Sequence, residues 1–430
     1  MYEIITVSLG MIVSISLLLA GMPIAVSVGL AGVLTLLLNE GFNSLNAVTF
    51  IIWGSINNAS LSSLPLFVLM AEFMLRSGMS DSYYAGMSQF IRKAPGGLLQ
   101  TNIASCALFA AISGSSVATA AAIGGVAIPR QRKDGYDLSM ACGSIAAGGT
   151  LGILIPPSIV MIIYATFSEL SVARLFAAGM VPGLLLTGMF MAYIAIRCMI
   201  NPSLAPKMPP AEKGWFWIGL KNVSPMLGLM VVILGAIFMG IATPTEAAGV
   251  GAFLAAVIAW FVGRPPLRAF GQALMNTILI SSSILFIVIG AFIFNYAIQT
   301  AGITQQLTQW VISLDLNVIA FLVAMLLFYI VLGCLVDSIG MIVMTVPLLL
   351  PILNAYNIDL IWFGVVLVVA VELGQVTPPV GINLYVVDQI SKAGIATVIR
   401  GVAPYFGIII LLLVLLTMFP SIATWLPSTM

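Results

Sequence analysis

The sequence predicts an all-α, polytopic membrane protein, and three observations carry that prediction. Of the 430 residues, 61% are hydrophobic and only 7% are charged, and the mean hydropathy is +1.17. A soluble domain averages about a quarter charged residues, so this chain could not cover its surface in water. Apolar runs of about 20 residues recur along the chain, and that is the length needed to cross a bilayer as a helix.

Composition also excludes several classes of function. A net charge of +1 without a basic tract argues against nucleic acid. The chain has no His, and its four Cys residues are scattered singly, so neither a zinc site nor a disulfide framework is expected. Ser and Asp occur, but no catalytic pair stands at helical spacing. We therefore expect neither an enzyme nor a cofactor.

Ten full crossings are expected, and the first begins close to the N-terminus. Residues 4–20 lack the positive start of a signal peptide, and apolar helix resumes directly after residues 21–23. The crossings lie near 4–20, 22–38, 61–77, 138–167, 173–197, 224–241, 243–262, 272–299, 360–388 and 401–420.

Two apolar stretches do not fit a full crossing, and we interpret each as a re-entrant hairpin. The first, about 96–129, is interrupted at Ser113-Gly114-Ser115-Ser116 and has basic residues on both flanks. Because positive residues stay in the cytoplasm, both of its ends lie on that side. The second, about 316–356, has Asp337 at its centre and opens to the other side. An N-terminus outside then places every Lys and Arg except Arg174 in the cytoplasm.

The two halves of the chain repeat one pattern of helix breakers. A shift of 222 residues superimposes Ser116 on Ser338 and Pro156-Pro157 on Pro378-Pro379. This predicts a first repeat at 1–200, a cytoplasmic linker at 201–222 and a second repeat at 223–430. Each repeat holds one hairpin and one broken helix, the latter at about 138–167 and 360–388. Five crossings in each repeat place the second upside down relative to the first.

Inverted repeats with broken helices are typical of secondary transporters, which bind their substrates near the bilayer midplane. A channel, an intramembrane enzyme and a structural membrane subunit are the alternatives. A channel would usually form an oligomer with a ring of residues around its pore. The missing catalytic pair argues against the enzyme, and a structural subunit would not need broken helices with Ser, Thr and Asn.

The broken segments carry the candidate binding residues. Each Pro-Pro pair forces an unwound stretch, whose free carbonyls suit Na⁺, while the N-termini of the half-helices suit a carboxylate. The candidate Na⁺ ligands are Ser113, Gly114, Ser115, Ser116, Gly149, Gly152, Asp337, Ser338, Gly374 and Thr377. The candidate substrate ligands are Ser116, Thr119, Pro156, Pro157, Ser158, Pro378, Pro379 and Asn383.

Ionisable residues within apolar segments are costly and usually functional. Glu72 is expected to pair with Arg76, one helical turn further on, in a structural role. Asp337 is the best candidate for a cation or proton site. Glu246, Glu372 and Asp388 could each be a site residue, a helix cap or an interfacial anchor.

Three strings resemble a known family: CALFAAISGSSVAT (106–119), GTLGILIPPS (149–158) and TPTEAA (243–248). They are similar to the large membrane subunit of tripartite ATP-independent periplasmic (TRAP) transporters, and the resemblance covers essentially the whole chain. It implies a multi-pass protein of the bacterial inner membrane that imports organic acid anions with Na⁺ by an elevator movement. The family's substrates include sialic acid, other sugar acids and C4-dicarboxylates.

The same resemblance implies two protein partners. One is a small four-helix membrane subunit, and the other is a soluble periplasmic protein that binds the substrate and delivers it. A stand-alone Na⁺/dicarboxylate symporter of similar hairpin architecture is the alternative within the class of transporters.

Overall fold

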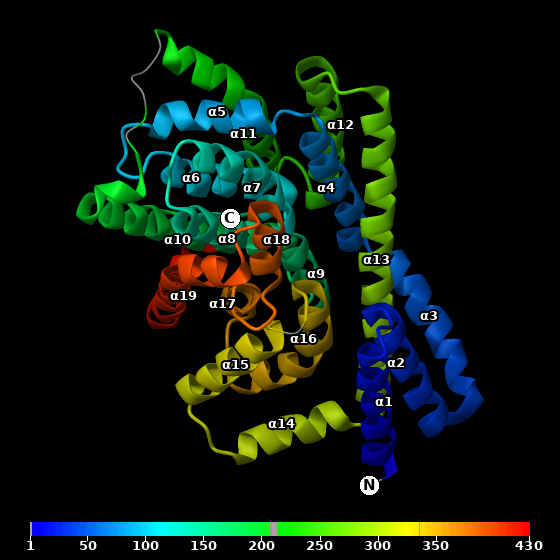
Figure 1. The fold of residues 1–430 in the computed structure, drawn as a ribbon. Helices are drawn as coiled ribbons and strands as arrows, with labels where there is room; N and C mark the ends of the chain where they lie inside the picture. Colours follow the sequence, from blue (N-terminus) through cyan, green and yellow to red (C-terminus); the bar gives the residue numbers. More distant parts are fainter. Residues whose placement is uncertain (1, 207, 209–212, 335) are drawn as a thin grey trace.

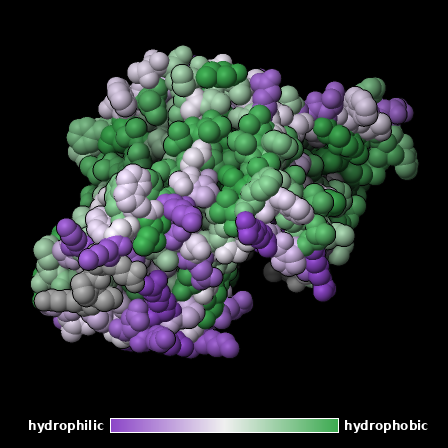
Figure 2. Space-filling view, turned by 90° about the horizontal axis from the view of Figure 1, so that it is seen from above, coloured by the Kyte–Doolittle hydropathy of each residue, from purple (hydrophilic) through white to green (hydrophobic). Residues whose placement is uncertain are grey.

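The protein is all-helical, as predicted. The computed structural model describes residues 2–206, 208, 213–334 and 336–430, and these residues form helices and loops without a strand. Among them, nine helices are long and apolar enough to cross a membrane. Large hydrophobic side chains such as Phe50, Trp217 and Phe253 point outward from them, which suits a lipid environment. Figure 2 views the end that is uppermost in Figure 1 and shows hydrophilic residues gathered beside broad hydrophobic surfaces.

One group of helices, which we call the wall lobe, lies mostly on the right of Figure 1, except that its member α11 (Trp215–Phe238) slants across the top from the upper left. It contains α1 (Tyr2–Leu19), α2 (Ile24–Glu40), α3 (Leu45–Ile56), α4 (Ala59–Arg76), α11 (Trp215–Phe238), α12 (Pro244–Ile258) and α13 (Leu267–Thr300). The long helix α13 packs against α2, α3 and α4. At the contact with α2, a Cβ on Gly32 would lie 2.7 Å from the backbone nitrogen of Phe294, so the two backbones nearly touch.

The second group, the core lobe, surrounds α8 and α9. It contains α6 (Leu98–Ser113), α7 (Ser116–Lys133), α8 (Leu138–Leu154), α9 (Ile159–Phe167), α10 (Val172–Ile200), α15 (Val318–Gly333), α16 (Ser338–Ala355), α17 (Leu360–Gln375), α18 (Ile382–Ser391), α19 (Ile395–Met418) and α20 (Ser421–Ser428). Helix α8 packs against α6, α7 and α19, and its residues from Met140 to Leu154 are all buried. Residues far apart in sequence therefore form one core.

Two short helices that the sequence analysis did not predict join the lobes. Helix α5 (Ser80–Ile91) packs on α11 of the wall lobe and on α6 and α7 of the core lobe. Helix α14 (Ile303–Ser313) contacts α13 on one side and α16 on the other. In Figure 1, α5 crosses the top of the molecule and α14 crosses the bottom.

Buried hydrogen bonds fix the base of the first hairpin, which is the end of α6 and α7 away from their shared turn. Tyr84 Oη donates to Asn102 Oδ1 (2.7 Å), and Gln131 Nε2 donates to the same oxygen (2.7 Å). Asn102 Nδ2 donates to Ser144 Oγ (2.8 Å). All four side chains are fully buried, so this network joins α5, α6, α7 and α8 without help from solvent.

The predicted crossings need one correction. The segment after 22–38, for which no crossing is predicted, forms a further helix, α3, after a short 3₁₀ turn. Helix α11 begins at Trp215, so its first residues fall within the predicted linker at 201–222. Residues 207 and 209–212 of that linker lie outside the described residues.

Helix bounds in the two halves follow the 222-residue shift. Helices α7 and α16 each have 18 residues and begin at Ser116 and Ser338, and α8 and α17 are capped by Asp137 and Asp359. Helix α15, however, packs more extensively on α17 than on α16, whereas α6 and α7 pack closely together. The inverted division of the chain and the depth of each hairpin in the bilayer stay predictions.

Candidate functional site

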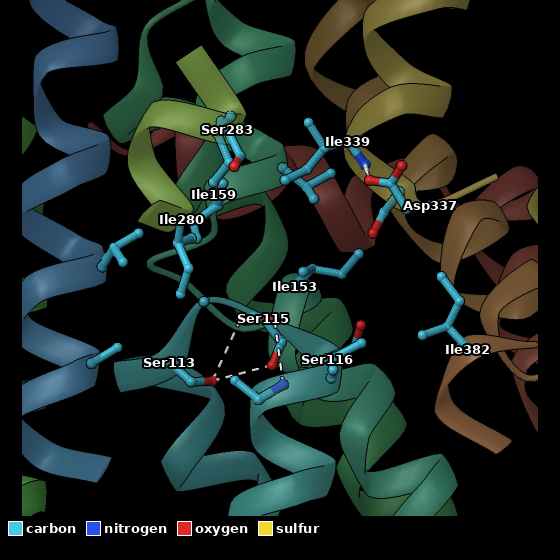
Figure 3. Close-up of a pocket in the computed structure, with 18 of the residues that line it drawn as sticks. Ser113, Ser115, Ser116, Ile153, Ile159, Ile280, Ser283, Asp337, Ile339 and Ile382 are labelled. Carbon is cyan, nitrogen blue, oxygen red and sulfur yellow. Dashed lines mark hydrogen bonds between the residues drawn. The ribbon is translucent and has the colours of Figure 1, made fainter. Parts of the chain in front are cut away.

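A cavity of about 450 Å³ lies between the two lobes (Figure 3). The core lobe contributes residues at both hairpin turns and beside both helix breaks. The wall lobe contributes one face each of α4 and α13. The lining includes Val68, Ala71, Glu72, Leu75, Ser113, Gly114, Ser115, Ser116, Val117, Ile153, Val160, Leu279, Ile280, Ser283, Asp337, Ser338, Ile339, Gln375 and Ile382. Of the described residues, no Lys or Arg lines it.

The turn of the first hairpin is built from small polar residues. Helix α6 ends at Ser113, and Gly114 takes a left-handed conformation (φ 59°) that a glycine adopts without strain. The Ser115 hydroxyl then caps α7 by accepting a hydrogen bond from Ala118 N (3.4 Å). Ser113 Oγ and Thr119 Oγ1 share a hydrogen bond of 2.6 Å across the turn. The turn therefore presents hydroxyls and the N-terminus of α7 to the cavity.

The second hairpin presents a charged residue at the matching place. Asp337 caps α16, because one carboxylate oxygen accepts hydrogen bonds from Ile339 N (3.1 Å) and Gly340 N (3.3 Å). Figure 3 shows Asp337 across the cavity from Ser113 and Ser115. Its side chain both caps a helix and lines the cavity, so the cap leaves its other carboxylate oxygen available at the predicted cation site.

The two helix breaks flank the same cavity. Pro156 and Pro157 separate α8 from α9, and Pro378 and Pro379 separate α17 from α18; both Pro-Pro bonds are cis. Pro156 and Pro157 have no N–H to donate to the carbonyls of Gly152 and Ile153. Carbonyl oxygens freed in this way are ligands that a hard cation such as Na⁺ can use.

Residues from the two halves meet here in matching pairs. Five pairs separated by 222 positions line the cavity, namely Ser115 with Asp337, Ser116 with Ser338, Val117 with Ile339, Ile153 with Gln375, and Val160 with Ile382. The N-termini of α7 and α16 both reach it. Because a helix N-terminus carries a partial positive charge, this arrangement favours an anionic group between them.

Several predicted ligands lie outside the cavity and have packing roles. A Cβ on Gly152 would lie 2.5 Å from the Ser115 carbonyl oxygen, and one on Gly374 would lie 2.6 Å from Gly333 Cα. The Thr377 hydroxyl donates to the Leu373 carbonyl four residues earlier. Gly149, Thr119, Pro156, Pro157, Ser158, Pro378, Pro379 and Asn383 are likewise absent from the lining, and the Ser158 hydroxyl caps α9.

The isolated acids have different surroundings. Glu72 accepts a hydrogen bond from Arg76 Nε (2.8 Å), which confirms the expected pair, and it also lines the cavity. Glu246 completes a capping box with Thr243 at the start of α12. Glu372 and one oxygen of Asp388 are buried without a hydrogen-bond partner among the described residues.

Sequence analysis missed most of the wall-lobe lining. Ala71, Leu279 and Ile280 look like ordinary lipid-facing or core residues, and Ser283 has the usual bond of a helical serine to the carbonyl four residues earlier. Nothing in their pattern distinguishes them. Only the expected Glu72–Arg76 pair drew attention to α4.

A membrane permease is the class of protein that this fold and cavity define, because the cavity sits between two packed lobes and is lined by broken helices from both halves. The chain belongs to the family of the DctM component of tripartite ATP-independent periplasmic transporters, whose family model matches residues 11–422. It is the large permease subunit of a TRAP transporter, a multi-pass protein of the inner membrane.

Individual relatives match over almost their full length. The C4-dicarboxylate TRAP transporter large permease protein DctM of Vibrio cholerae is 34% identical, over 98% of this chain and 97% of that protein. Its counterpart in Pseudomonas aeruginosa is 35% identical, over 94% of both chains. The sialic acid TRAP transporter large permease protein SiaM of Vibrio cholerae is 30% identical, over 96% of both.

Among solved structures, the fold is similar to that of the YdaH transporter of Alcanivorax borkumensis. The TM-score is 0.63 with 16% sequence identity, over 91% of each chain. At this identity the likeness concerns the fold alone.

Proposed function

We propose that this subunit imports a small organic acid anion together with Na⁺, and that the core lobe moves along the wall lobe during transport. The observation that carries the proposal is the placement of the cavity. One side consists of both hairpin turns and of residues beside both helix breaks, while the other consists of α4 and α13. A substrate bound to the turns would therefore travel with the core lobe.

The anion would be bound without a basic side chain. No Lys or Arg lines the described cavity, so the N-termini of α7 and α16 are the positive groups that the protein itself offers. Bound Na⁺ would add positive charge beside Asp337 and the Ser113–Ser116 turn. This dependence of anion binding on the cation gives a physical reason for coupling the two.

The substrate class follows from similarity to named relatives. Three relatives with 34–35% identity are named for C4-dicarboxylates. Others at 29–31% are named for sialic acid and for ectoine. We therefore place C4-dicarboxylates first among the acids to test, followed by sialic acid and other sugar acids.

Two partners complete the proposed transporter. The family name describes a tripartite system, in which a small membrane subunit and a soluble periplasmic binding protein would join this chain. The relative named isethionate TRAP transporter permease protein DctMQ is longer, since this chain covers 64% of it. The remaining length of that relative leaves room for a fused second subunit.

Uptake into proteoliposomes tests the proposal. Both membrane subunits are reconstituted, labelled succinate or sialic acid is added with the binding protein, and a Na⁺ gradient is applied. Accumulation should need the gradient and the binding protein together. Uptake that persists without Na⁺, or that follows a proton gradient alone, would contradict the coupling, and uptake without the binding protein would favour a stand-alone symporter.

A further inference from the structure

Glu372 is a buried acid whose negative charge has no visible counterpart. It lies on α17, one turn before the cavity residue Gln375, and its side chain is 2% exposed. Neither of its carboxylate oxygens has a hydrogen-bond partner among the described residues. A buried, ionised carboxylate without a donor is strongly disfavoured, so this group either holds a proton or is paired with a cation.

The groups around Glu372 supply oxygen atoms. The Ser116 hydroxyl, at the start of α7, lies near the carboxylate, although no hydrogen bond joins the two in the described part of the chain. Gly152 of α8 packs directly on Ser115 and Ser116, and α8 in turn contacts α17. Because Pro156 has no N–H, the Gly152 carbonyl lacks its helical donor.

A carboxylate, a hydroxyl and a freed carbonyl from three different helices therefore belong to one packed cluster. We infer that Glu372 supplies the negative charge for a Na⁺ ion held at the turn of the first hairpin. The inference rests on the proposed function and adds to it a ligand or charge partner from the opposite half of the chain.

The two hairpin turns differ in this respect. The residue that matches Glu372 in the first half is Thr150, whose hydroxyl donates to the Ala147 carbonyl (2.6 Å). Thr150 thus carries no charge at the position where its match in the second half does. The carboxylate at the second turn is Asp337, which lines the cavity.

Thermal unfolding at increasing Na⁺ concentration tests the inference without measuring transport. The purified complex of large and small membrane subunits is heated in detergent, with choline replacing Na⁺ at constant ionic strength. Na⁺ that binds only the folded protein raises the unfolding temperature, so the titration midpoint reports affinity. For Glu372→Gln we expect that midpoint to rise by about 10- to 100-fold, as for lost partners at other metal sites.

Glu246→Gln is the matched control, because it removes a carboxylate from the capping box of α12, which the described cavity does not include. Glutamine can take the same place in a capping box, so this variant should fold and leave the midpoint unchanged. If Glu372→Gln does not fold, Glu372→Asp is used in its place. It keeps the carboxylate on a side chain that is shorter by one methylene, and its titration midpoint should also rise.

The outcomes separate the inference from the proposed function. Suppose that Na⁺ stabilises the parent protein and that Glu372→Gln has the same titration midpoint as the parent. Glu372 is then a neutral structural residue, and the inference is overturned. The same holds for Glu372→Asp if Glu372→Gln does not fold. If Na⁺ does not stabilise the parent protein at any concentration, the proposed Na⁺ coupling fails, and the inference fails with it.

Discussion

At the scale of single residues, the two hairpin turns cap matching helices with side chains of different charge. Ser115 and Asp337 occupy equivalent positions, each begins a helix that points into the cavity, and each caps that helix with its own side chain. Capping needs only an oxygen atom, which serine and aspartate both provide. The charge of Asp337 is therefore more than the cap requires, and we attribute it to cation binding.

Asp337→Asn removes the negative charge but keeps the helix cap, because asparagine and aspartate are equally good N-cap residues. We expect the variant to insert and fold normally. The Na⁺ concentration for half-maximal uptake should rise by about tenfold or more, because a charged contact contributes about 1.5–3 kcal/mol. Uptake is measured against Na⁺ concentration at equal amounts of inserted protein.

Asp359→Asn is its matched control. Asp359 caps α17 through Trp362 N (2.8 Å), is exposed and lies outside the cavity, so the same substitution there should leave Na⁺ dependence unchanged. Superimposable Na⁺ curves for Asp337→Asn and the parent protein would contradict the role of Asp337 in cation binding.

At the scale of helices, glycine contacts determine how closely the core lobe packs. Gly143 of α8 and Gly401 of α19 meet backbone to backbone, and Gly333 of α15 and Gly374 of α17 do the same. Between membrane helices, small residues allow this close approach, and the resulting van der Waals packing drives association. Gly374, which the sequence analysis names as a candidate Na⁺ ligand, thus has a packing role between α15 and α17.

Gly401→Ala should destabilise the core lobe. The added Cβ would lie 2.0 Å from the Ser139 carbonyl oxygen and 3.0 Å from Gly143 N, so α8 and α19 must move apart. Overpacking of this kind costs about 1–3 kcal/mol, and the unfolding temperature in detergent should fall. Gly407→Ala, on the same helix but with open space around it, should leave that temperature unchanged or raise it. The expectation fails if Gly401→Ala is as stable as the parent protein.

Local sequence pattern accounts for some of these elements and not for others. The breaks at Gly114, Pro156 and Pro378 could be predicted because glycine and proline interrupt helices by their own covalent structure. Helices α5 and α14 were not predicted, because each is short and contains polar residues. Contacts with both lobes stabilise them in the folded protein. The approach of Glu372 to Ser116 joins opposite halves of the chain, and no local pattern indicates such a contact.

At the scale of the whole molecule, two lobes meet at one cavity and are joined by α5 and α14. The wall lobe packs around α13, and the core lobe packs around α8. Basic residues follow α5 and end α7, at Arg92, Lys93 and Arg130 to Lys133. This distribution supports an orientation in which the base of the first hairpin faces the cytoplasm.

Single cysteines test that orientation. Lys93 and Lys133 are exposed and lie on either side of the first hairpin, whereas the four native cysteines are buried. In a background with those cysteines replaced by serine, Lys93→Cys and Lys133→Cys should both react with a membrane-impermeant thiol reagent in inside-out vesicles. Neither should react in cells whose inner membrane is intact. Labelling from opposite faces would contradict the re-entrant hairpin and the inverted repeat together.

The buried network of Tyr84, Asn102, Gln131 and Ser144 has a mechanical consequence. It fixes the first hairpin at its base, whereas the hydrogen bonds of Ser113, Ser115 and Thr119 at the turn stay within the turn itself. A helical pair held in this way is tied to its neighbours by polar side chains at its base and by close packing of Gly152 on Ser115 at its turn. In the proposed transport cycle, moving the turn would require that packing contact to open, whereas the hydrogen bonds at the base could stay intact.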